Sequence, residues 1–280
     1  MMCYARKIME LSPEIRAYYE NAPEHERLRT GPSQLEFDRT KELLRDRLPE
    51  LPATILDIGG GPGPYALWLA ELGYEVHLID PVGSLIEHAQ TFSRTAARPV
   101  KSCSIGDARS LQWKSNSVDA VLELGPLYHL VEHADRLRAL TEAFRVLRPG
   151  GQVFAAAISW FASALDGLSR DLFADEAFRT IVTHDLKDGI HRNDTRNLGY
   201  FTTAKFHRPE ELKEEFSQAG FENVEVFGIE GPGWLFPDFN ERWNDTRRRN
   251  DLMTVARSLE SEPSIQGVSA HLLAVGRRPL

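Results

Sequence analysis

The feature that most constrains this chain is a glycine-rich turn between two apolar strands. Residues 54–58 read TILDI, residues 59–63 read GGGPG, and a helix-like run leads to a second apolar strand that ends on Asp80. Glycines let a backbone approach a ligand that side chains would block, and this order of strand, turn, helix and strand builds a nucleotide site. An acid at the end of the second strand can accept hydrogen bonds from both hydroxyls of a ribose. We therefore expect an α/β protein that binds a nucleotide.

Two classes of nucleotide cofactor fit this turn. Residues 61–66, which read GPGPYA, satisfy the dinucleotide fingerprint with alanine last, and Asp80 lies where the ribose-binding acid is expected. Asp57, however, stands two residues before Gly59, and its carboxylate would repel a pyrophosphate. S-adenosylmethionine carries an ammonium group and no phosphate, so this electrostatic argument favours it. A nicotinamide-dependent oxidoreductase stays as the alternative.

Further motifs follow the turn in a consistent order. Residues 104–108 read SIGDA after a third apolar segment, and residues 117–125 read SVDAVLELG, a fourth strand that runs into PLYHL. Residues 143–151 read AFRVLRPGG, which is typical of a helix end and turn before a fifth strand. Together these segments resemble the class I S-adenosylmethionine-dependent methyltransferases, in the methyltransferase type 11 branch of small-molecule enzymes that includes the ubiquinone/menaquinone group. The resemblance covers roughly residues 50 to 158.

The resemblance implies a fold and a cofactor site. The fold would be a Rossmann-like, doubly wound, seven-stranded sheet, mainly parallel, with an antiparallel last strand. Asp80 would bind the ribose and Asp107 would lie near the adenine amino group, while Glu123 and Gly125 would border the sulfonium end unless Glu123 faces away. Tyr19 would form a wall for the methionine end, or pack on its own helix. The expected cofactor-binding residues are Asp57, Gly59, Gly60, Gly61, Gly63, Asp80, Pro81, Gly106, Asp107, Ala108, Glu123, Leu124, Gly125 and Tyr19.

Hydrophobic periodicity predicts the organisation of the rest of the chain. Residues 12–48 read as two amphipathic helices that are broken near residues 30–33. The domains expected are an N-terminal helical lid at 1–50, a cofactor-binding core at 51–158, a helical cap insertion at 159–208, and the end of the sheet at 209–280 with a second insertion at 231–267. The expected strands are 54–58, 75–80, 100–105, 118–124, 152–158, 222–229 and one near 270–277, and the expected helices between them are 64–72, 83–94, 134–147 and 209–219.

The residues for the transfer step are expected where the fourth strand ends and in the cap. His129 is the best candidate for a general base, with a structural histidine as the alternative, and Tyr128 would line the acceptor pocket. Tyr200 would add an aromatic wall from the cap, unless it belongs to the core. Trp234 could close the pocket from the second insertion. Residues 184–194 are rich in metal-ligand types, but their spacing matches no zinc pattern, so we expect a solvated loop and no metal.

Composition restricts the partners. The net charge of −8 argues against a nucleic-acid substrate, which normally requires a basic surface. No apolar run is long enough to span a membrane or to act as a signal peptide, and two distant cysteines form no disulfide framework, so a cytoplasmic setting is expected. The predicted function is methyl transfer to an oxygen, nitrogen or sulfur atom of a small molecule, with S-adenosylhomocysteine as the product. Methyl transfer to carbon stays as an alternative. A non-catalytic cofactor-binding module is a second alternative, and the oligomeric state cannot be predicted.

Overall fold

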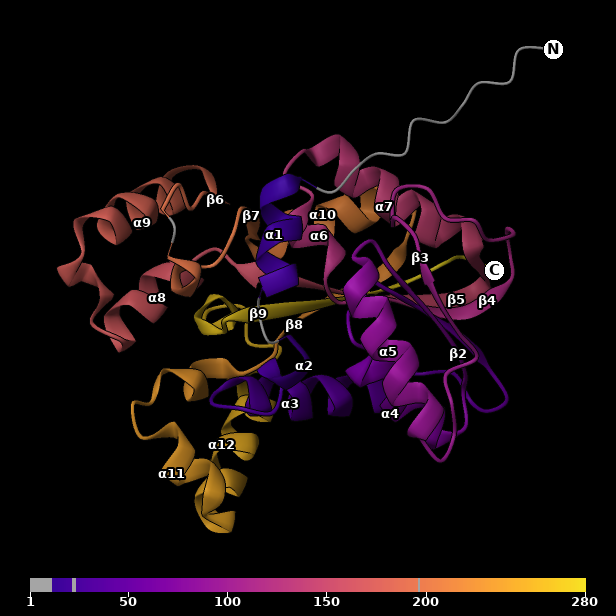
Figure 1. Ribbon diagram of the computed structural model, residues 1–280, viewed down its shortest axis with the longest axis horizontal. Helices are drawn as coiled ribbons and strands as arrows, with labels where there is room; N and C mark the ends of the chain where they lie inside the picture. The colour runs from indigo at the N-terminus through magenta and orange to yellow at the C-terminus, as the bar shows by residue number, and fades with distance from the viewer. Residues whose placement is uncertain (1–11, 22–23, 196) are drawn as a thin grey trace.

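A computed structural model describes residues 12–21, 24–195 and 197–280 of the chain. Its centre is a twisted sheet with the strand order β3-β2-β1-β4-β5-β9-β8 (Figure 1). The strands are β1 Thr54–Ile58, β2 Glu75–Asp80, β3 Ser102–Ile105, β4 Val118–Glu123, β5 Leu147–Ser159, β8 Glu222–Gly228 and β9 His271–Arg277.

The direction of the seven expected strands confirms a mainly parallel sheet with an antiparallel last strand, and β6 and β7 extend it to nine strands within the described residues. β1 pairs in parallel with β2 and β4, β2 with β3, and β4 with β5. β9 runs antiparallel between β5 and β8, with Gln152 opposite Arg277 and Ile158 opposite His271. The strand order reverses between β1 and β4, which is where open α/β sheets bind their ligands.

Helices cover both faces of this sheet. On one face the buried side chains of the sheet pack against α3 (Ser33–Arg45), α4 (Pro64–Leu72) and α5 (Gly83–Thr95). On the other face they pack against α7 (His133–Val146) and α10 (Pro209–Gln218). The strands read as continuous apolar runs because both of their faces are buried.

The N-terminal segment and the two insertions have more structure than the sequence predicted. The N-terminal segment forms α1 (Pro13–Asn21), α2 (Glu24–Arg27) and α3, where two helices were expected. The first insertion contains α8 (Ala162–Ser169), α9 (Glu176–Asp188) and an unpredicted hairpin of β6 (Ile190–His191) and β7 (Ala204–His207). β7 also pairs with the end of β5, placing Phe206 beside Ile158.

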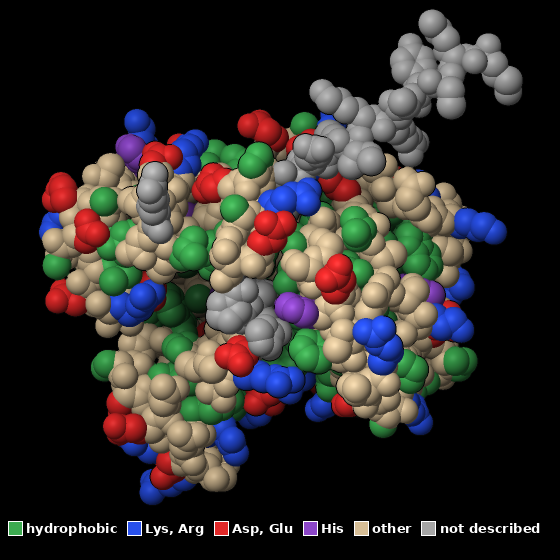
Figure 2. All heavy atoms as spheres, viewed as in Figure 1, with side chains coloured by type: hydrophobic (Ala, Val, Ile, Leu, Met, Phe, Trp, Pro, Cys, Tyr) green, Lys and Arg blue, Asp and Glu red, His purple; other side chains and the backbone are tan. Residues whose placement is uncertain are grey.

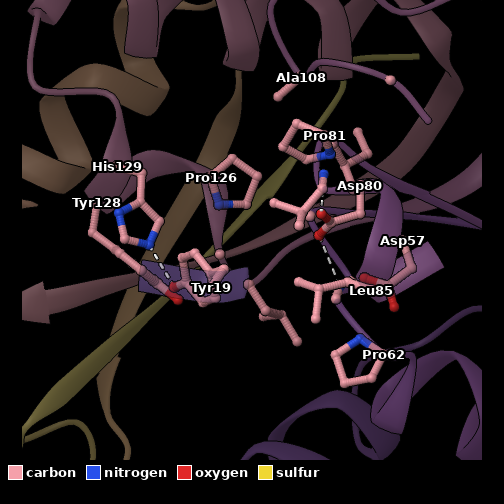
Figure 3. A pocket seen from close by; sticks show the side chains of 18 of the residues that line it. Tyr19, Asp57, Pro62, Asp80, Pro81, Leu85, Ala108, Pro126, Tyr128 and His129 are labelled. Carbon is pink, nitrogen blue, oxygen red and sulfur yellow. Dashed lines mark hydrogen bonds between the residues drawn. The ribbon is translucent and has the colours of Figure 1, made fainter. Parts of the chain in front are cut away.

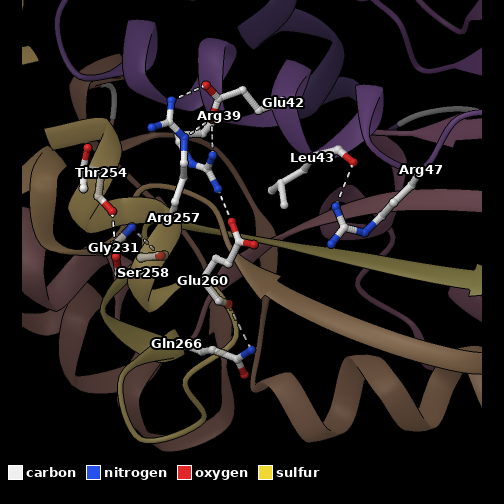
Figure 4. A network of polar contacts seen from close by, with 11 residues as sticks. Arg39, Glu42, Leu43, Arg47, Gly231, Thr254, Arg257, Ser258, Glu260 and Gln266 are labelled. Carbon is white, nitrogen blue, oxygen red and sulfur yellow. Dashed lines mark hydrogen bonds and ion pairs between the residues drawn. The ribbon is translucent and has the colours of Figure 1, made fainter. Parts of the chain in front are cut away.

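The second insertion packs on the N-terminal segment. It contains α11 (Phe239–Asn244) and α12 (Thr246–Leu259), and its Trp243 and Leu252 share an apolar cluster with Leu35 of α3. The fully buried Arg39 of α3 lies between Glu42 and Glu260, and Arg257 of α12 donates to Glu42 at 2.6 Å and 3.0 Å (Figure 4). This ionic network fastens the second insertion to α3.

No helix in the described part of the chain is both long enough and apolar enough to cross a lipid bilayer. Acidic and basic side chains are interspersed over the face seen in Figure 2, which presents no continuous basic surface.

A buried ion pair joins the first insertion to the core. Arg136 of α7 donates to Glu215 of α10 at 2.8 Å and 2.7 Å, and His207 of β7 lies 3.3 Å from the same carboxylate. Burial opposes ionisation of Glu215, but hydrogen bonds from His207 and Arg136 hold its pKa down at about 2. The carboxylate therefore stays charged at every pH at which a protein normally folds.

Replacing Glu215 with alanine should destabilise the protein by about 3–5 kcal/mol, because Arg136 would keep its buried charge without a partner. Since the pKa of Glu215 is lowered on folding, the stabilisation is present above pH 4.5 and is lost as the pH falls toward about 2. Urea denaturation of Glu215→Ala and of the exposed neighbour Glu214→Ala measures the difference. An equal effect of the two variants would contradict the assignment.

Candidate active site

A pocket opens at the carboxyl ends of β1, β2 and β4. It is lined by the turns after those strands and after β3, and also by residues of α1 and α2 (Figure 3). The pocket brings together most of the residues predicted from the sequence. They are Tyr19, Asp57, Gly59, Gly60, Gly61, Asp80, Pro81, Gly106, Asp107, Ala108, Leu124, Gly125, Tyr128 and His129.

The glycine turn after β1 forms the floor of this pocket. Gly59 has a φ of +70°, and a Cβ atom there would stand 2.7 Å from the ring of Pro126. A Cβ atom on Gly60 would stand 2.6 Å from the carboxylate of Asp57. Glycine is therefore required at both positions by close approach, and at Gly59 also by backbone conformation. Gly63 is the N-cap residue that precedes α4, and it does not line the pocket, so its role is in the turn itself.

Asp80 fixes the turn and faces the pocket. Its two carboxylate oxygens accept hydrogen bonds from the backbone amides of Gly61 at 2.9 Å and Val82 at 2.8 Å. Each carboxylate oxygen has two lone pairs, so the group can also accept hydrogen bonds from ribose hydroxyls. This geometry agrees with the role predicted for Asp80.

Asp57 is a buried acid beside the same turn. Neither of its carboxylate oxygens has a hydrogen-bond partner among the residues that the structure describes. Burial and the neighbouring charge of Asp80 raise the pKa of Asp57 to about 7. A buried acid without a partner suits a cationic ligand, because an ammonium group would supply both the missing hydrogen bonds and the missing charge. The site therefore fits the ammonium group of S-adenosylmethionine.

The turn after β3 forms the other end of the pocket. Asp107 accepts hydrogen bonds from Arg109, including one from the backbone amide at 2.8 Å and one from the guanidinium at 2.6 Å. Arg109 also donates to Asp135 at 2.8 Å. A Cβ atom on Gly106 would stand 2.5 Å from Ile79, so the turn passes close to β2. These contacts fix the place at which an adenine ring is expected.

Glu123 does not line the pocket, although its neighbours Leu124 and Gly125 do. It is fully buried at the end of β4, opposite Ala155, on the face covered by α7. Neither carboxylate oxygen has a hydrogen-bond partner within the described ranges, and burial raises the pKa of Glu123 to about 8. The alternative in which Glu123 faces away from the sulfonium end is the one that the structure supports.

Tyr19 and His129 meet at the edge of the pocket. The hydroxyl of Tyr19 lies 2.6 Å from Nε2 of His129, and the two rings pack edge to face at 5.2 Å (Figure 3). Burial lowers the pKa of His129 to about 4, so the imidazole is neutral at pH 7 and one of its nitrogens can accept a proton. Tyr128 packs on His129 with a centroid distance of 4.6 Å. The base predicted from the sequence is therefore paired with a tyrosine from α1.

The first insertion holds α1 over this pair. Glu14 of α1 accepts hydrogen bonds from the backbone amide and the hydroxyl of Thr203, at 3.2 Å and 2.9 Å. Tyr18 packs against Phe201 at 5.4 Å, and Phe201 in turn lies 5.9 Å from the ring of His129. Phe201 has a φ of +68° and a ψ of −164°, a region that is almost exclusive to glycine. A strained residue is thus placed where the lid, the cap and His129 meet.

Tyr200, the third predicted catalytic residue, lies in the interior of the cap and not at the pocket. Its hydroxyl donates to Asp175 at 2.6 Å and its ring packs on Phe178. The alternative of core packing therefore describes Tyr200 in this structure. Trp234 is also buried, and its indole donates to the carbonyl of Val268.

The prediction of a solvated loop at residues 184–194 is wrong. Asp185 belongs to α9 and is fully buried, and it accepts hydrogen bonds from Ser163 at 2.5 Å and from His191 at 2.8 Å. The other ring nitrogen of His191 donates to the carbonyl of Tyr200 at 2.7 Å. These polar residues hold the cap together.

Two charged residues of the pocket were not predicted from the sequence. Arg27 and Arg109 both line the pocket. Arg109 stands two residues after the predicted Asp107, so the local motif could have indicated it. Arg27 lies in a short helix far from every motif, and the sequence carries no signal for it.

Comparison with known proteins identifies related sequences. Residues 56–155 match the family model of a methyltransferase domain. A ubiquinone/menaquinone biosynthesis C-methyltransferase, UbiE of Nitrosospira multiformis, is 31% identical over 182 residues, which are 62% of this chain and 69% of that protein. An uncharacterized methyltransferase of Mycobacterium tuberculosis is 36% identical over 106 residues, 38% of this chain and 40% of its own length. A probable tRNA methyltransferase 9B of Mus musculus is 31% identical over 119 residues, 42% of this chain and 24% of that protein.

Solved structures share the fold. A methyltransferase from Methanosarcina mazei, described as S-adenosylmethionine-dependent, superimposes with a TM-score of 0.57 at 20% identity and covers 85% of this chain and 97% of its own. Phosphoethanolamine N-methyltransferase 2 of Haemonchus contortus, in complex with S-adenosyl-L-methionine, gives a TM-score of 0.55 at 17% identity over 87% of this chain and 52% of its own. At these identities the likeness concerns the fold.

Replacing Asp80 with alanine should weaken the binding of S-adenosylhomocysteine by about 1–3 kcal/mol, because the ribose hydroxyls would lose their acceptor. Asp80→Asn, which keeps one acceptor oxygen, should lose less. Calorimetric titration measures both variants, with the exposed Glu87→Ala on α5 as a control that should bind like the wild type. Unchanged affinity in Asp80→Ala would show that the ribose lies elsewhere.

Replacing Glu123 with leucine should stabilise the protein, because an apolar side chain of similar size would fill an apolar environment. Folding raises the pKa of Glu123 from 4.5 to about 8. The buried carboxyl therefore destabilises the fold little below pH 4.5 and most above pH 8, where it would ionise. The gain from Glu123→Leu should therefore grow across this range, by up to about 4 kcal/mol. Denaturation at pH 5 and pH 8 measures it, with Glu123→Gln as a variant of similar shape that cannot ionise. A gain independent of pH would mean that Glu123 is ionised and paired.

Proposed function

Because this chain belongs to the S-adenosylmethionine-dependent methyltransferases, we propose that it methylates an oxygen, nitrogen or sulfur atom of a small molecule. The observation that carries this proposal is the Tyr19–His129 pair at the edge of the cofactor pocket, beneath a helix that the cap holds in place. The match covers 40% of the length of the mycobacterial relative, so the relatives do not establish a substrate for this chain. The substrate is therefore part of the proposal.

The pocket provides one acidic residue for each end of the cofactor and one for its centre. Asp57 would bind the ammonium group, Asp80 the ribose hydroxyls, and Asp107 the side of the adenine amino group. Leu124, Gly125 and Tyr19 would line the sulfonium end. When bound, the cofactor supplies a methyl group that is already activated by a positively charged sulfur.

The protein's own residues then position the acceptor and exclude water. Neutral His129 can take the acceptor's proton directly at a ring nitrogen, or through the hydroxyl of Tyr19, with which it shares a hydrogen bond. Tyr128 would orient the acceptor from the side. Helix α1, tied to the cap by Glu14 and Tyr18, would close the site, which protects the sulfonium from water.

The enclosed geometry supports a small acceptor over a macromolecule. Tyr19 of α1 and Phe201 of the cap both pack against the ring of His129, and this aromatic enclosure supports a small acceptor. The net charge of −8 points the same way. Some relatives are named tRNA methyltransferases, so transfer RNA is the acceptor that a test has to include. Membership of the family sets aside the nicotinamide-dependent alternative. Detectable methyl transfer would distinguish the proposed enzyme from a non-catalytic cofactor-binding module.

The first experiment combines binding with transfer. Calorimetry should show micromolar binding of S-adenosylhomocysteine and no binding of NAD. Transfer of a labelled methyl group is then measured with a panel of small phenols, amines, thiols and carboxylic acids, and with bulk transfer RNA. Turnover with one class of small nucleophile supports the proposal. Transfer to RNA alone would overturn the small-molecule assignment, and tight binding without any transfer would favour the non-catalytic module.

Replacing His129 with asparagine should slow transfer on the order of 10²–10⁴-fold, because the acceptor's proton would lose its base. Affinity for S-adenosylhomocysteine should change little. Tyr19→Phe keeps the ring and removes the hydroxyl, so it should also lose activity. The double variant Tyr19→Phe/His129→Asn should be no slower than His129→Asn alone. His133→Asn, an exposed histidine on α7, is the matched control and should retain full activity.

A parallel loss of cofactor affinity and transfer rate in His129→Asn would contradict this role. It would mean that the Tyr19–His129 hydrogen bond serves only to hold α1 in place.

A further inference from the structure

The methionine end of S-adenosylmethionine carries a carboxylate as well as an ammonium group. Asp57 accounts for the ammonium group, and the carboxylate requires a cation or a set of N–H donors. Two cationic side chains line the pocket in the part of the chain that the structure describes, Arg27 and Arg109, since His129 is neutral at pH 7. The order of the strands decides between them.

Arg109 lies at the wrong end of the pocket for the methionine carboxylate. It follows β3, the edge strand of the sheet, and its guanidinium is held between Asp107 and Asp135. The acids of the site follow the sheet from that edge, with Asp107 after β3, Asp80 at the end of β2 and Asp57 in β1. The methionine end therefore extends away from Arg109, toward β4 and beyond.

Arg27 lies at that opposite end. It donates to Glu36 of α3 through both terminal nitrogens, at 2.7 Å and 3.2 Å. Glu36 in turn lies 3.9 Å from Nδ1 of His271, the first residue of β9, on the far side of β4 and β5 from β3. Arg27 also shares the pocket wall with Tyr19 and Tyr65, the second of which follows the glycine turn directly.

The charges around Arg27 hold its guanidinium in place. His271 lies between Glu36 and Glu230, with its Nδ1 2.6 Å from Glu230. Burial opposes a charged imidazole, but the two glutamates raise the pKa of His271, while Arg27 and His271 lower the pKa of Glu36 against its own burial. Arg27, Glu36, His271 and Glu230 thus form a chain in which nitrogen donors alternate with carboxylates. The three ligand atoms of Glu36, Glu230 and His271 lie within 4.8 Å of one another, but the two carboxylates are already paired with Arg27 and His271.

We propose that Arg27 binds the carboxylate of the cofactor's methionine moiety, and that Glu36 positions its guanidinium. A guanidinium has five N–H donors in a planar fork, so it can hold a protein carboxylate on one edge and a ligand carboxylate on another. The cofactor's zwitterionic end would then be held at two points of opposite charge, Asp57 and Arg27. This inference rests on the cofactor class and is independent of the acceptor.

The test compares two ligands that differ by one carboxyl group. S-adenosylhomocysteine has the carboxylate, and its decarboxylated analogue S-adenosyl-3-thiopropylamine has the ammonium group alone. Arg27→Ala should weaken the binding of S-adenosylhomocysteine about 10- to 100-fold, as expected for a charged hydrogen bond. The same variant should bind the analogue within about 3-fold of the wild type, because the lost interaction is absent from that ligand.

Three further variants make the result specific. Arg27→Lys keeps the charge without the fork, so it should recover part of the affinity for S-adenosylhomocysteine. Glu36→Gln should reproduce a weaker form of the Arg27→Ala pattern if Glu36 positions the guanidinium. Arg29→Ala, an exposed arginine two residues away, should bind both ligands like the wild type.

The two ligands also separate a local effect from misfolding. An equal loss for both ligands in Arg27→Ala would overturn the proposal, because it would mean a damaged pocket. Unchanged affinity for S-adenosylhomocysteine would overturn it as well, while leaving the cofactor class intact. Failure of the wild-type protein to bind S-adenosylhomocysteine would instead contradict the cofactor class.

Discussion

The site depends on the carboxylate of Asp80, which joins two strands and the glycine turn. By accepting hydrogen bonds from Gly61 and Val82, it fixes the turn after β1 against the turn after β2. The turn can then pass under Pro126 at a distance that leaves no room for a side chain. This arrangement brings a second acid, Asp57, next to the first, and burial together with the charge of Asp80 raises the pKa of Asp57 to about 7. The charges of Asp57 and Asp80 repel each other within the pocket, and a cationic ligand would relieve this repulsion.

The sequence predicted the parts of the site that follow from local geometry. Strand, glycine turn and terminal acid lie within some 25 residues, so the positions of Asp57 and Asp80 could be predicted without the fold. The orientation of Glu123 was harder to predict, because the face of the sheet on which a side chain lies depends on the register of the neighbouring strands. Residues 184–194 were misread through their composition, although Phe178, Ile181, Val182 and Asp185 have the spacing of a buried helix face.

Other contacts of the site could not be predicted, because they join segments that are far apart in the chain. Tyr19 meets His129 across 110 residues, and Glu14 meets Thr203 across 189. Arg27 is connected to β9 through Glu36 and His271. Each of these contacts involves the N-terminal segment, whose apolar anchors predict helices without indicating what the polar face contacts. The tertiary arrangement decides which polar residues of an amphipathic helix lie in a site.

The attachment of α1 links the two ends of the active site. Its hydrogen-bonded contacts beyond the pocket go to Thr203 of the cap, and its aromatic contacts go to Phe201 and His129. The cap also carries the strained backbone of Phe201, which the amide of Asn193 holds through a 2.6 Å hydrogen bond to its carbonyl. Under the proposed function, closure of α1 over the cofactor would therefore depend on the cap as well as on His129, which follows β4. A change in the cap that suits a different acceptor would then also alter how α1 closes. Acceptor choice and protection of the sulfonium would be coupled through the hydrogen bonds of Glu14 to Thr203 and the contact of Tyr18 with Phe201.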